Sequence, residues 1–238
     1  MRQIEDRESG ECEQQSAKAG GFPRQAEACE QQLEQLATSG RLQEYRYLHV
    51  ATHGMLDPKI ALHSALILSQ DKLPDPLQQV LAGKRAYDGR LTAAQILRTW
   101  KLDAELVTFS ACQSGLGKYE GGEGYLGFAQ ALFVAGSRSL VLSQWQVDDN
   151  ATALLMTRFY QNLLGKRKGL AKPLPKAEAL REAKAWLRSL TVKEVEHHLA
   201  ALPRGAEREK PAAPVPAAVH PYAHPYYWAA FILIGDPR

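Results

Sequence analysis

Short apolar segments alternate along the chain with longer segments rich in residues that favour helices. The apolar segments contain mainly aliphatic and aromatic residues and predict strands at 45–51, 65–68, 105–111, 140–145 and 227–234. The longer segments predict helices at 24–36, 92–100, 124–135, 149–164, 177–190 and 192–202. Strands separated by helices in this way are typical of an α/β fold with a mostly parallel sheet.

Three segments lack the pattern of a packed element. Residues 1–22 are polar and are predicted to be disordered, or to be the edge of something larger, so the globular domain is expected to cover 23–238. Residues 70–90 have a mixed composition and are expected to form a loop. Residues 203–225 consist mainly of proline, alanine and charged residues. Such a segment cannot pack a core, and we expect it to be an extended insertion before the last strand.

The composition suits one globular domain and argues against several classes of function. The 238 residues are 45% hydrophobic and have a formal net charge of +3, without the dense clusters of Lys and Arg found in nucleic-acid binders. No apolar run approaches the ~20 residues that cross a membrane, and the polar, acidic start is unlike a signal peptide. We therefore expect a cytoplasmic protein that binds neither nucleic acid directly nor a membrane.

The cysteines carry no sign of a disulfide framework or a metal site. Cys12, Cys29 and Cys112 are an odd number, are scattered along the chain, and lack metal-ligand spacing. In a reducing compartment they should be free thiols. No metal or other cofactor is expected.

Two reactive side chains follow two of the predicted strands. His53 comes just after the strand 45–51, and Cys112, in the stretch TFSACQSGLG, comes just after the strand that begins at 105. Two parallel strands joined by a crossover have their carboxyl ends at the same edge of the sheet, where functional groups gather. A thiolate can attack a carbonyl carbon while an imidazole takes the thiol proton. The N–H groups of Gly54 and Cys112 are then the natural donors to the resulting oxyanion.

Each residue also has a purely structural interpretation. Cys112 alone is more simply a buried thiol, and His53 alone is equally well a hydrogen-bonded histidine in a turn. His49 lies within the strand and is expected to be a core or supporting residue. A metal site made of His49, His53 and His63 would lack a carboxylate or cysteine at ligand spacing. Two reactive residue types at two strand ends, each with glycine nearby, nevertheless favour a catalytic site.

Four segments, in this order, resemble the successive blocks of the CHAT domain. They are YLHVATHG (47–54), LVTFSACQSGLG (106–117), GEGYLGFAQALFVAGSRSLVLSQWQVDDNAT (122–152) and HPYYWAAFILIGDP (224–237). The CHAT domain belongs to the caspase and separase group of cysteine peptidases and often accompanies tetratricopeptide repeats. Several long blocks in one order are far more specific than a single short motif.

The resemblance implies a caspase-like three-layer α/β/α sandwich that works as a cysteine endopeptidase on a protein substrate. It implies His53 as the general base, Cys112 as the nucleophile, and an oxyanion hole formed by the N–H groups of Gly54 and Cys112. In the separase-like branch, an acidic residue after the next strand binds a basic substrate side chain at P1, the residue before the scissile bond. Asp149, and after it Asp148, correspond to that position, although either could instead cap the following helix.

A second interpretation remains open. A caspase-like sheet normally begins with strands before the histidine strand, and residues 1–44 offer a helix and little convincing strand. The chain would then be a catalytically silent module that docks on a repeat protein, such as a tetratricopeptide-repeat protein, or on a sensor protein. Under the peptidase interpretation, the basic stretch 165–169 is a candidate self-cleavage site, although a solvated loop explains it as well. A nucleophile-elbow hydrolase would need glycine on both sides of Cys112, which the sequence lacks.

Overall fold

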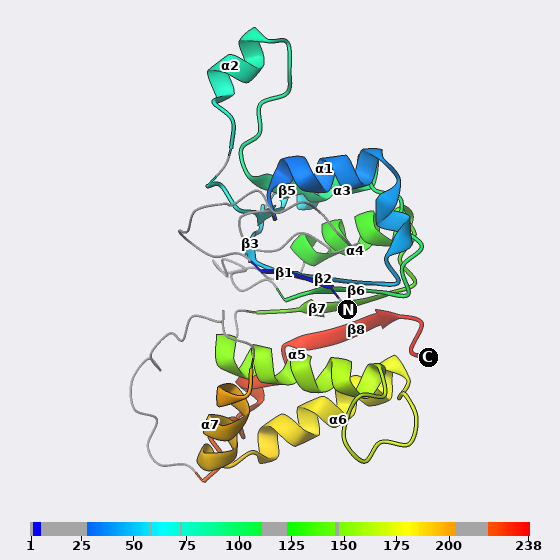
Figure 1. Cartoon of the computed structure of the whole chain (residues 1–238), viewed down its shortest axis with the longest axis vertical. Helices are drawn as coiled ribbons and strands as arrows, with labels where there is room; N and C mark the ends of the chain where they lie inside the picture. The colour runs from blue at the N-terminus through cyan, green and yellow to red at the C-terminus, as the bar shows by residue number, and fades with distance from the viewer. Residues whose placement is uncertain are drawn as a thin grey trace. The chain divides into compact units, whose positions relative to one another are not determined.

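The computed structural model describes residues 2–5, 28–57, 59–71, 73–110, 123–145, 148–202 and 219–238. The chain divides into two compact units, Met1–Trp145 and Gln146–Arg238 (Figure 1). The first unit contains the sheet with the predicted histidine strand, and the second is mainly helical. The predicted insertion at 203–225 falls mostly on residues 203–218, which lie outside the described residues.

A parallel sheet forms the centre of the first unit. Its strands lie in the order β1 (Arg2–Glu5), β2 (Tyr47–Ala51), β6 (Leu106–Phe109) and β7 (Ser139–Ser143). All three neighbouring pairs are parallel. Every residue of β6 and β7 is buried, in keeping with their continuous apolar runs. The apolar runs that predict these strands are therefore the runs that the sheet buries.

Strand β1 departs from the sequence prediction. It lies within the segment 1–22, which was expected to be disordered or to be the edge of something larger, and the rest of that segment is outside the described residues. Arg2 to Glu5 pair with Leu48 to Ala51 of β2, so the main-chain groups of a polar segment find partners far along the chain. The structure thus supplies a strand before the histidine strand, which the sequence did not indicate.

A second, antiparallel sheet follows directly after β2. It consists of β3 (His53–Met55), β4 (Ala65–Ile67) and β5 (Arg90–Thr92), in that order. Thr52, between β2 and β3, is buried and donates its hydroxyl to the carbonyl of Ile67. This side chain therefore fixes the point at which the chain leaves one sheet for the other.

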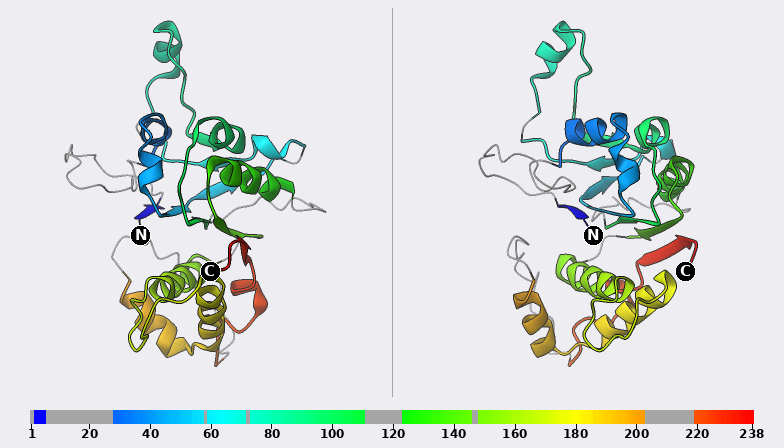
Figure 2. Two further views of the ribbon diagram at one scale, coloured as in Figure 1. Left: turned by 90° about the vertical axis from the view of Figure 1, so that its right-hand side faces the viewer. Right: turned by 45° about the vertical axis from the view of Figure 1, so that its right-hand side comes forward.

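The segment between β4 and β5 was expected to be a loop but contains a short helix, α2 (Pro76–Leu81). Asp75 caps it by accepting hydrogen bonds from the N–H groups of Leu77, at 2.8 Å, and Gln78, at 3.3 Å. Pro76 occupies the first turn, where its missing N–H costs nothing. Figures 1 and 2 show α2 at the tip of an arm that extends from the first unit.

Helices cover one face of the parallel sheet of the first unit: α1 (Glu30–Thr38), α3 (Ala93–Thr99) and α4 (Glu123–Ala135) (Figures 1 and 2). The 3-10 turn η2 (Arg41–Glu44) lies between α1 and β2, and a second one, η3 (Ala61–His63), lies between β3 and β4. Thr92 and Gln95 form a complete capping box at the start of α3. The fully buried side chains of this unit come from both layers and include Leu33, Leu42, Leu48, Ile96, Leu106 and Leu132.

The second unit packs α5 (Asp149–Leu163) against α6 (Lys176–Ser189), followed by α7 (Val192–Ala200). Its last elements are the 3-10 turn η4 (Pro225–Tyr227) and β8 (Phe231–Gly235). The predicted last strand therefore begins four residues later than expected, because its first residues follow Pro225 into a turn.

The fold class predicted from the sequence is confirmed. The structure has mixed helix and strand content around a mostly parallel sheet, which is compatible with a three-layer α/β/α sandwich. Within the described ranges, no helix combines the length and hydrophobicity needed to cross a membrane.

Candidate active site

The carboxyl ends of β2 and β6 lie side by side. The two strands are parallel neighbours, with Val50 opposite Phe109. The N–H of Ser110, the first residue after β6, donates to the carbonyl of Val50 at 3.0 Å, so the pairing continues one residue beyond the strand. The prediction that His53 and Cys112 lie at the same edge of the sheet requires this parallel pairing of the two strands. Cys112 follows Ser110 by two residues in the sequence and lies outside the described residues, so the pairing of the two side chains stays a prediction.

His53 lies at the start of β3, opposite Ile67, and its side chain is exposed. The sequence places it in a turn after the strand, whereas the structure places it on a second strand only two residues after β2 ends. Its backbone is consequently held in a hydrogen-bonded ladder while the imidazole faces solvent. The imidazole is therefore accessible from solvent.

Gly54 occupies the middle of β3, opposite Leu66, and is partly buried. β3 forms one edge of the three-stranded sheet. At an edge, alternate N–H groups of the strand face away from the neighbouring strand and are open to another acceptor. Such backbone donors are the groups that an oxyanion hole requires. The assignment of the Gly54 and Cys112 N–H groups to that role stays a prediction.

His49, the other histidine of this region, has a different environment. Its side chain is 2% exposed, and its Nε2 lies 2.7 Å from Oγ of Ser110. Burial lowers the pKa of His49 to about 3, so the ring is neutral across the range in which enzymes usually work. The prediction that His49 is a core or supporting residue is confirmed.

The three histidines considered as metal ligands do not share one environment. His49 is buried, whereas His53 and His63 are exposed. Nδ1 of His63 lies 3.8 Å from the Asp57 carboxylate. Among the residues that the structure describes, no group of three His, Cys, Asp or Glu side chains could hold a metal ion.

The two candidate acids for a basic P1 side chain lie in the second unit and differ from each other. Asp148 is the N-cap of α5, with its carboxylate accepting from the N–H of Ala151 at 2.8 Å. It also hydrogen-bonds the hydroxyl of Tyr222. Burial, and then the charge of Asp148, raise the pKa of Tyr222. Asp149 lies in the first turn of the same helix and is exposed.

One of the two acids therefore suffices for capping, as the sequence argument supposes. The cap is Asp148, and the exposed carboxylate of Asp149 is the one that the helix start does not use. Their contribution to a substrate pocket stays a prediction.

Sequence reasoning did not identify Ser110 or Tyr222. Ser110 is buried directly after a fully apolar strand, and its position beside the candidate nucleophile was a usable signal. Tyr222 falls in the segment 203–225 that was expected to be an extended insertion, yet it is 8% exposed. Nothing in the local sequence distinguishes it from the other tyrosines near the C-terminus, because its hydrogen-bond partner, Asp148, lies far away in the chain.

The comparison with family models matches residues 12–236 to the CHAT domain. None of the curated proteins searched matches the chain. The family match spans nearly the whole chain, including β2, β3, β6 and the acids at the start of α5. The chain belongs to the CHAT domain family, which is related to the caspase-like cysteine peptidases.

Proposed function

We propose that the chain is a cysteine endopeptidase that cuts a protein substrate with Cys112 as nucleophile and His53 as general base. The observation that carries the proposal is the parallel pairing of β2 and β6, whose carboxyl ends adjoin in a chain of the CHAT family. The chain after each of these ends contributes one of the two reactive residues. Membership of a family related to cysteine peptidases supports the same chemistry.

The reaction divides into two steps. His53 takes the proton of the Cys112 thiol, and the thiolate attacks the carbonyl carbon of the scissile peptide bond. The N–H groups of Gly54 and Cys112 stabilise the oxyanion of the tetrahedral intermediate. The peptide C–N bond breaks and the leaving amine takes a proton from His53 as the thioester acyl-enzyme forms. A water molecule, deprotonated by His53, then attacks the thioester carbon, the C–S bond breaks, and the carboxylic acid product leaves while the Cys112 thiolate regains its proton from His53. His49 is unsuited to this role, because it is buried, neutral and already hydrogen-bonded to Ser110.

For the substrate, we propose a basic residue at P1 that pairs with Asp149, with Asp148 as the second candidate. Asp149 supports this choice because its carboxylate is exposed, whereas Asp148 is committed to the helix cap and to Tyr222. A carboxylate that becomes desolvated by the substrate would favour Arg or Lys over neutral side chains.

The alternative is a silent module that docks on a tetratricopeptide-repeat or sensor protein. The exposed apolar side chains of α2 favour it, since Leu77, Val80 and Leu81 are 66%, 61% and 77% exposed on a projecting arm. The lack of strands before the histidine strand, from which this alternative was inferred, is a weaker argument because β1 pairs with β2.

A pooled fluorogenic peptide library that varies P1 tests the proposal. We expect cleavage by the wild type and its loss in Cys112→Ala and in His53→Ala. His63→Ala is the matched control, because His63 is an exposed histidine of the same unit, and this variant should retain full activity. A folded wild type that neither cleaves the library nor reacts with a thiol-directed peptide probe would refute the peptidase and favour the silent module.

A further inference from the structure

A buried side-chain hydrogen bond joins β2 to the end of β6. Nε2 of His49 and Oγ of Ser110 lie 2.7 Å apart, and the two residues are only 2% and 6% exposed. A hydrogen bond in such surroundings is shielded from water, so either group left without the other would have no solvent to replace it. The bond is therefore a strong constraint on both side chains.

Ser110 makes two hydrogen bonds to residues of β2. Its N–H donates to the carbonyl of Val50 at 3.0 Å, and its hydroxyl meets His49 at 2.7 Å. Two attachments from one residue, one through the main chain and one through the side chain, define both its position and its orientation. Ser110 is also the last described residue before Cys112, which follows it by two residues.

We propose that His49 is a positioning residue, which holds Ser110 at the end of β6 and thereby supports the reactivity of Cys112, two residues further along the chain. This inference rests on the proposed function. His49 takes no proton from substrate or thiol in this role. Its contribution is geometric, and small displacements of a reacting group lower rates steeply.

The chemistry of His49 suits this role. Burial lowers its pKa to about 3, so the ring carries no charge that would require a buried counter-ion. A planar ring on a buried strand also has little freedom to move, which makes it a firmer support than a long flexible side chain. A glutamine could place its terminal amide near the position of Nε2, whereas phenylalanine would fill the space without a hydrogen bond.

The test is the rate at which iodoacetamide alkylates Cys112, followed by peptide mass spectrometry as a function of pH. The thiolate displaces iodide and forms a thioether, so the curve reports the thiolate fraction without any need for a peptide substrate. The mass of the Cys112 peptide separates this reaction from those of Cys12 and Cys29. The variants are His49→Phe, Ser110→Ala, their double mutant and His49→Gln.

We expect the wild-type curve to show a lowered thiol pKa. In His49→Phe and in Ser110→Ala it should move toward the ordinary value of about 8.5, which makes alkylation at pH 6.5 at least about tenfold slower. The double mutant should be no slower than either single mutant, because both remove the same bond. His49→Gln should recover much of the wild-type rate.

The matched control is Ser137→Ala. Ser137 is as buried as Ser110, at 6% exposed, and donates its hydroxyl to the carbonyl of Ser139 at 2.8 Å, just before β7 begins. The parallel sheet therefore has this serine at its amino-terminal edge, away from the strand ends that precede His53 and Cys112. Its loss should lower the melting temperature without moving the alkylation curve.

The outcomes separate the two ideas. A wild-type thiol with an ordinary pKa would refute the reactive dyad, and the positioning role would fail with it. A reactive wild-type thiol whose curve is unchanged in folded Ser110→Ala and His49→Phe would leave the peptidase standing and overturn the positioning role. Rate losses that add in the double mutant would also overturn it, since two independent packing defects would then explain them.

Discussion

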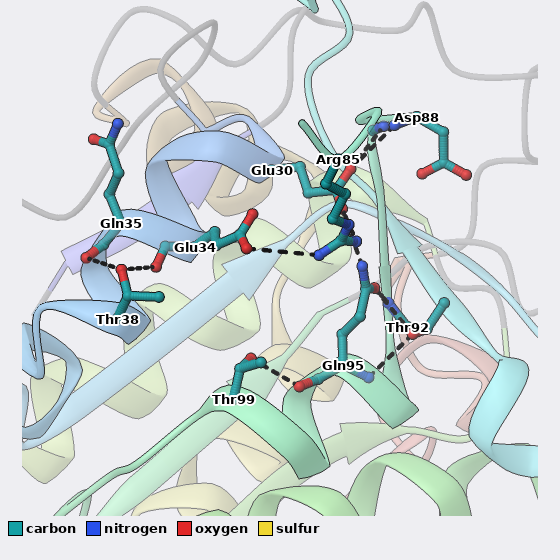
Figure 3. Close-up of polar contacts among 10 residues, drawn as sticks. Glu30, Glu34, Gln35, Thr38, Arg85, Asp88, Thr92, Gln95 and Thr99 are labelled. Atoms are coloured by element: carbon teal, nitrogen blue, oxygen red, sulfur yellow. Dashed lines mark hydrogen bonds and ion pairs between the residues drawn. The ribbon is translucent and has the colours of Figure 1, made fainter. Parts of the chain in front are cut away.

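Glu30 of α1 and Arg85, which are 55 residues apart in the sequence, form an ion pair with 2.6 Å between Oε1 and Nη2 (Figure 3). Glu30 is 3% exposed, whereas the Arg85 side chain is 44% exposed. The Glu30 carboxylate also accepts the N–H groups of Asp88 and Gly89, each at 3.2 Å, and Nε2 of Gln95 at 3.0 Å. One buried carboxylate thus fixes the end of the α2 arm to α1 and α3.

Glu30→Ala should destabilise the first unit by about 2–3 kcal/mol, because it leaves the buried N–H of Gly89 and the partly buried N–H of Asp88 without this acceptor. Urea denaturation followed by circular dichroism measures the change. The matched control is Glu34→Ala. Glu34 lies 3.8 Å from Arg85 and is 32% exposed, so its loss should cost less than about 1 kcal/mol. Equal losses from the two variants would contradict the role assigned to Glu30.

The pH dependence of stability should also report Glu30. Burial raises its pKa above the usual value and outweighs the attraction of Arg85. The folded state therefore holds this proton more tightly than the unfolded state. The favourable contribution is fully present below the ordinary pKa of 4.5 and is lost as the pH rises through the higher folded value.

Glu30→Gln removes this titration. The free energy of unfolding of the wild type minus that of Glu30→Gln should consequently be larger at pH 4.5 than at pH 7.5, and denaturant titrations at the two pH values measure both. A difference that grows toward pH 7.5 would show that the attraction of Arg85 outweighs burial.

Arg158→Lys should destabilise the second unit by about 1–2 kcal/mol. The Arg158 guanidinium donates through Nε and Nη2 to the Glu182 carboxylate, at distances down to 2.6 Å, and stacks over Trp186 with 4.9 Å to the ring centroid. Lysine has neither the planar fork nor the stacking face. The change in the urea midpoint gives the measurement.

A surface ion pair offers the control for Arg158. Arg138 lies 3.2 Å from Asp103, but the two side chains are 58% and 72% exposed. Arg138→Lys should change the free energy of unfolding by no more than about 0.5 kcal/mol. If the two substitutions had equal effects, the geometry around Arg158 would be irrelevant to stability.

The adjacent acids at the start of α5 should separate stability from specificity. Asp148→Ala should lower the free energy of unfolding by about 1 kcal/mol, because it removes the side chain that caps α5 by accepting from the N–H of Ala151. Asp148→Asn should keep most of the stability, because asparagine can also cap a helix. Asp149→Ala should leave the stability nearly unchanged and relax the preference for Arg or Lys at P1. Melting curves together with the peptide library measure both effects. An unchanged P1 preference in Asp149→Ala would remove this residue from the proposed substrate pocket.

Much of the fold could be predicted because its strands and helices have strong local patterns. The apolar runs at 45–51, 105–111 and 140–145 appear as β2, β6 and β7, and the helix predicted at 92–100 appears as α3 with its capping box. β1 could not be predicted, because Arg2–Glu5 is short and polar and becomes a strand only by pairing with β2. α2 was missed because its apolar side chains are exposed, so no buried face reveals it.

By itself, the sequence determined the α/β class and the order of reactive residues along it, through periodicity and composition that act over a few neighbouring residues. The tertiary structure decided which of two nearby histidines is buried and which of two adjacent acids caps a helix. His49 and His53 are four residues apart, yet one meets Ser110 in the core and the other faces solvent on a second sheet. Burial and hydrogen bonding of this kind arise between residues far apart in the chain, and no local pattern records them.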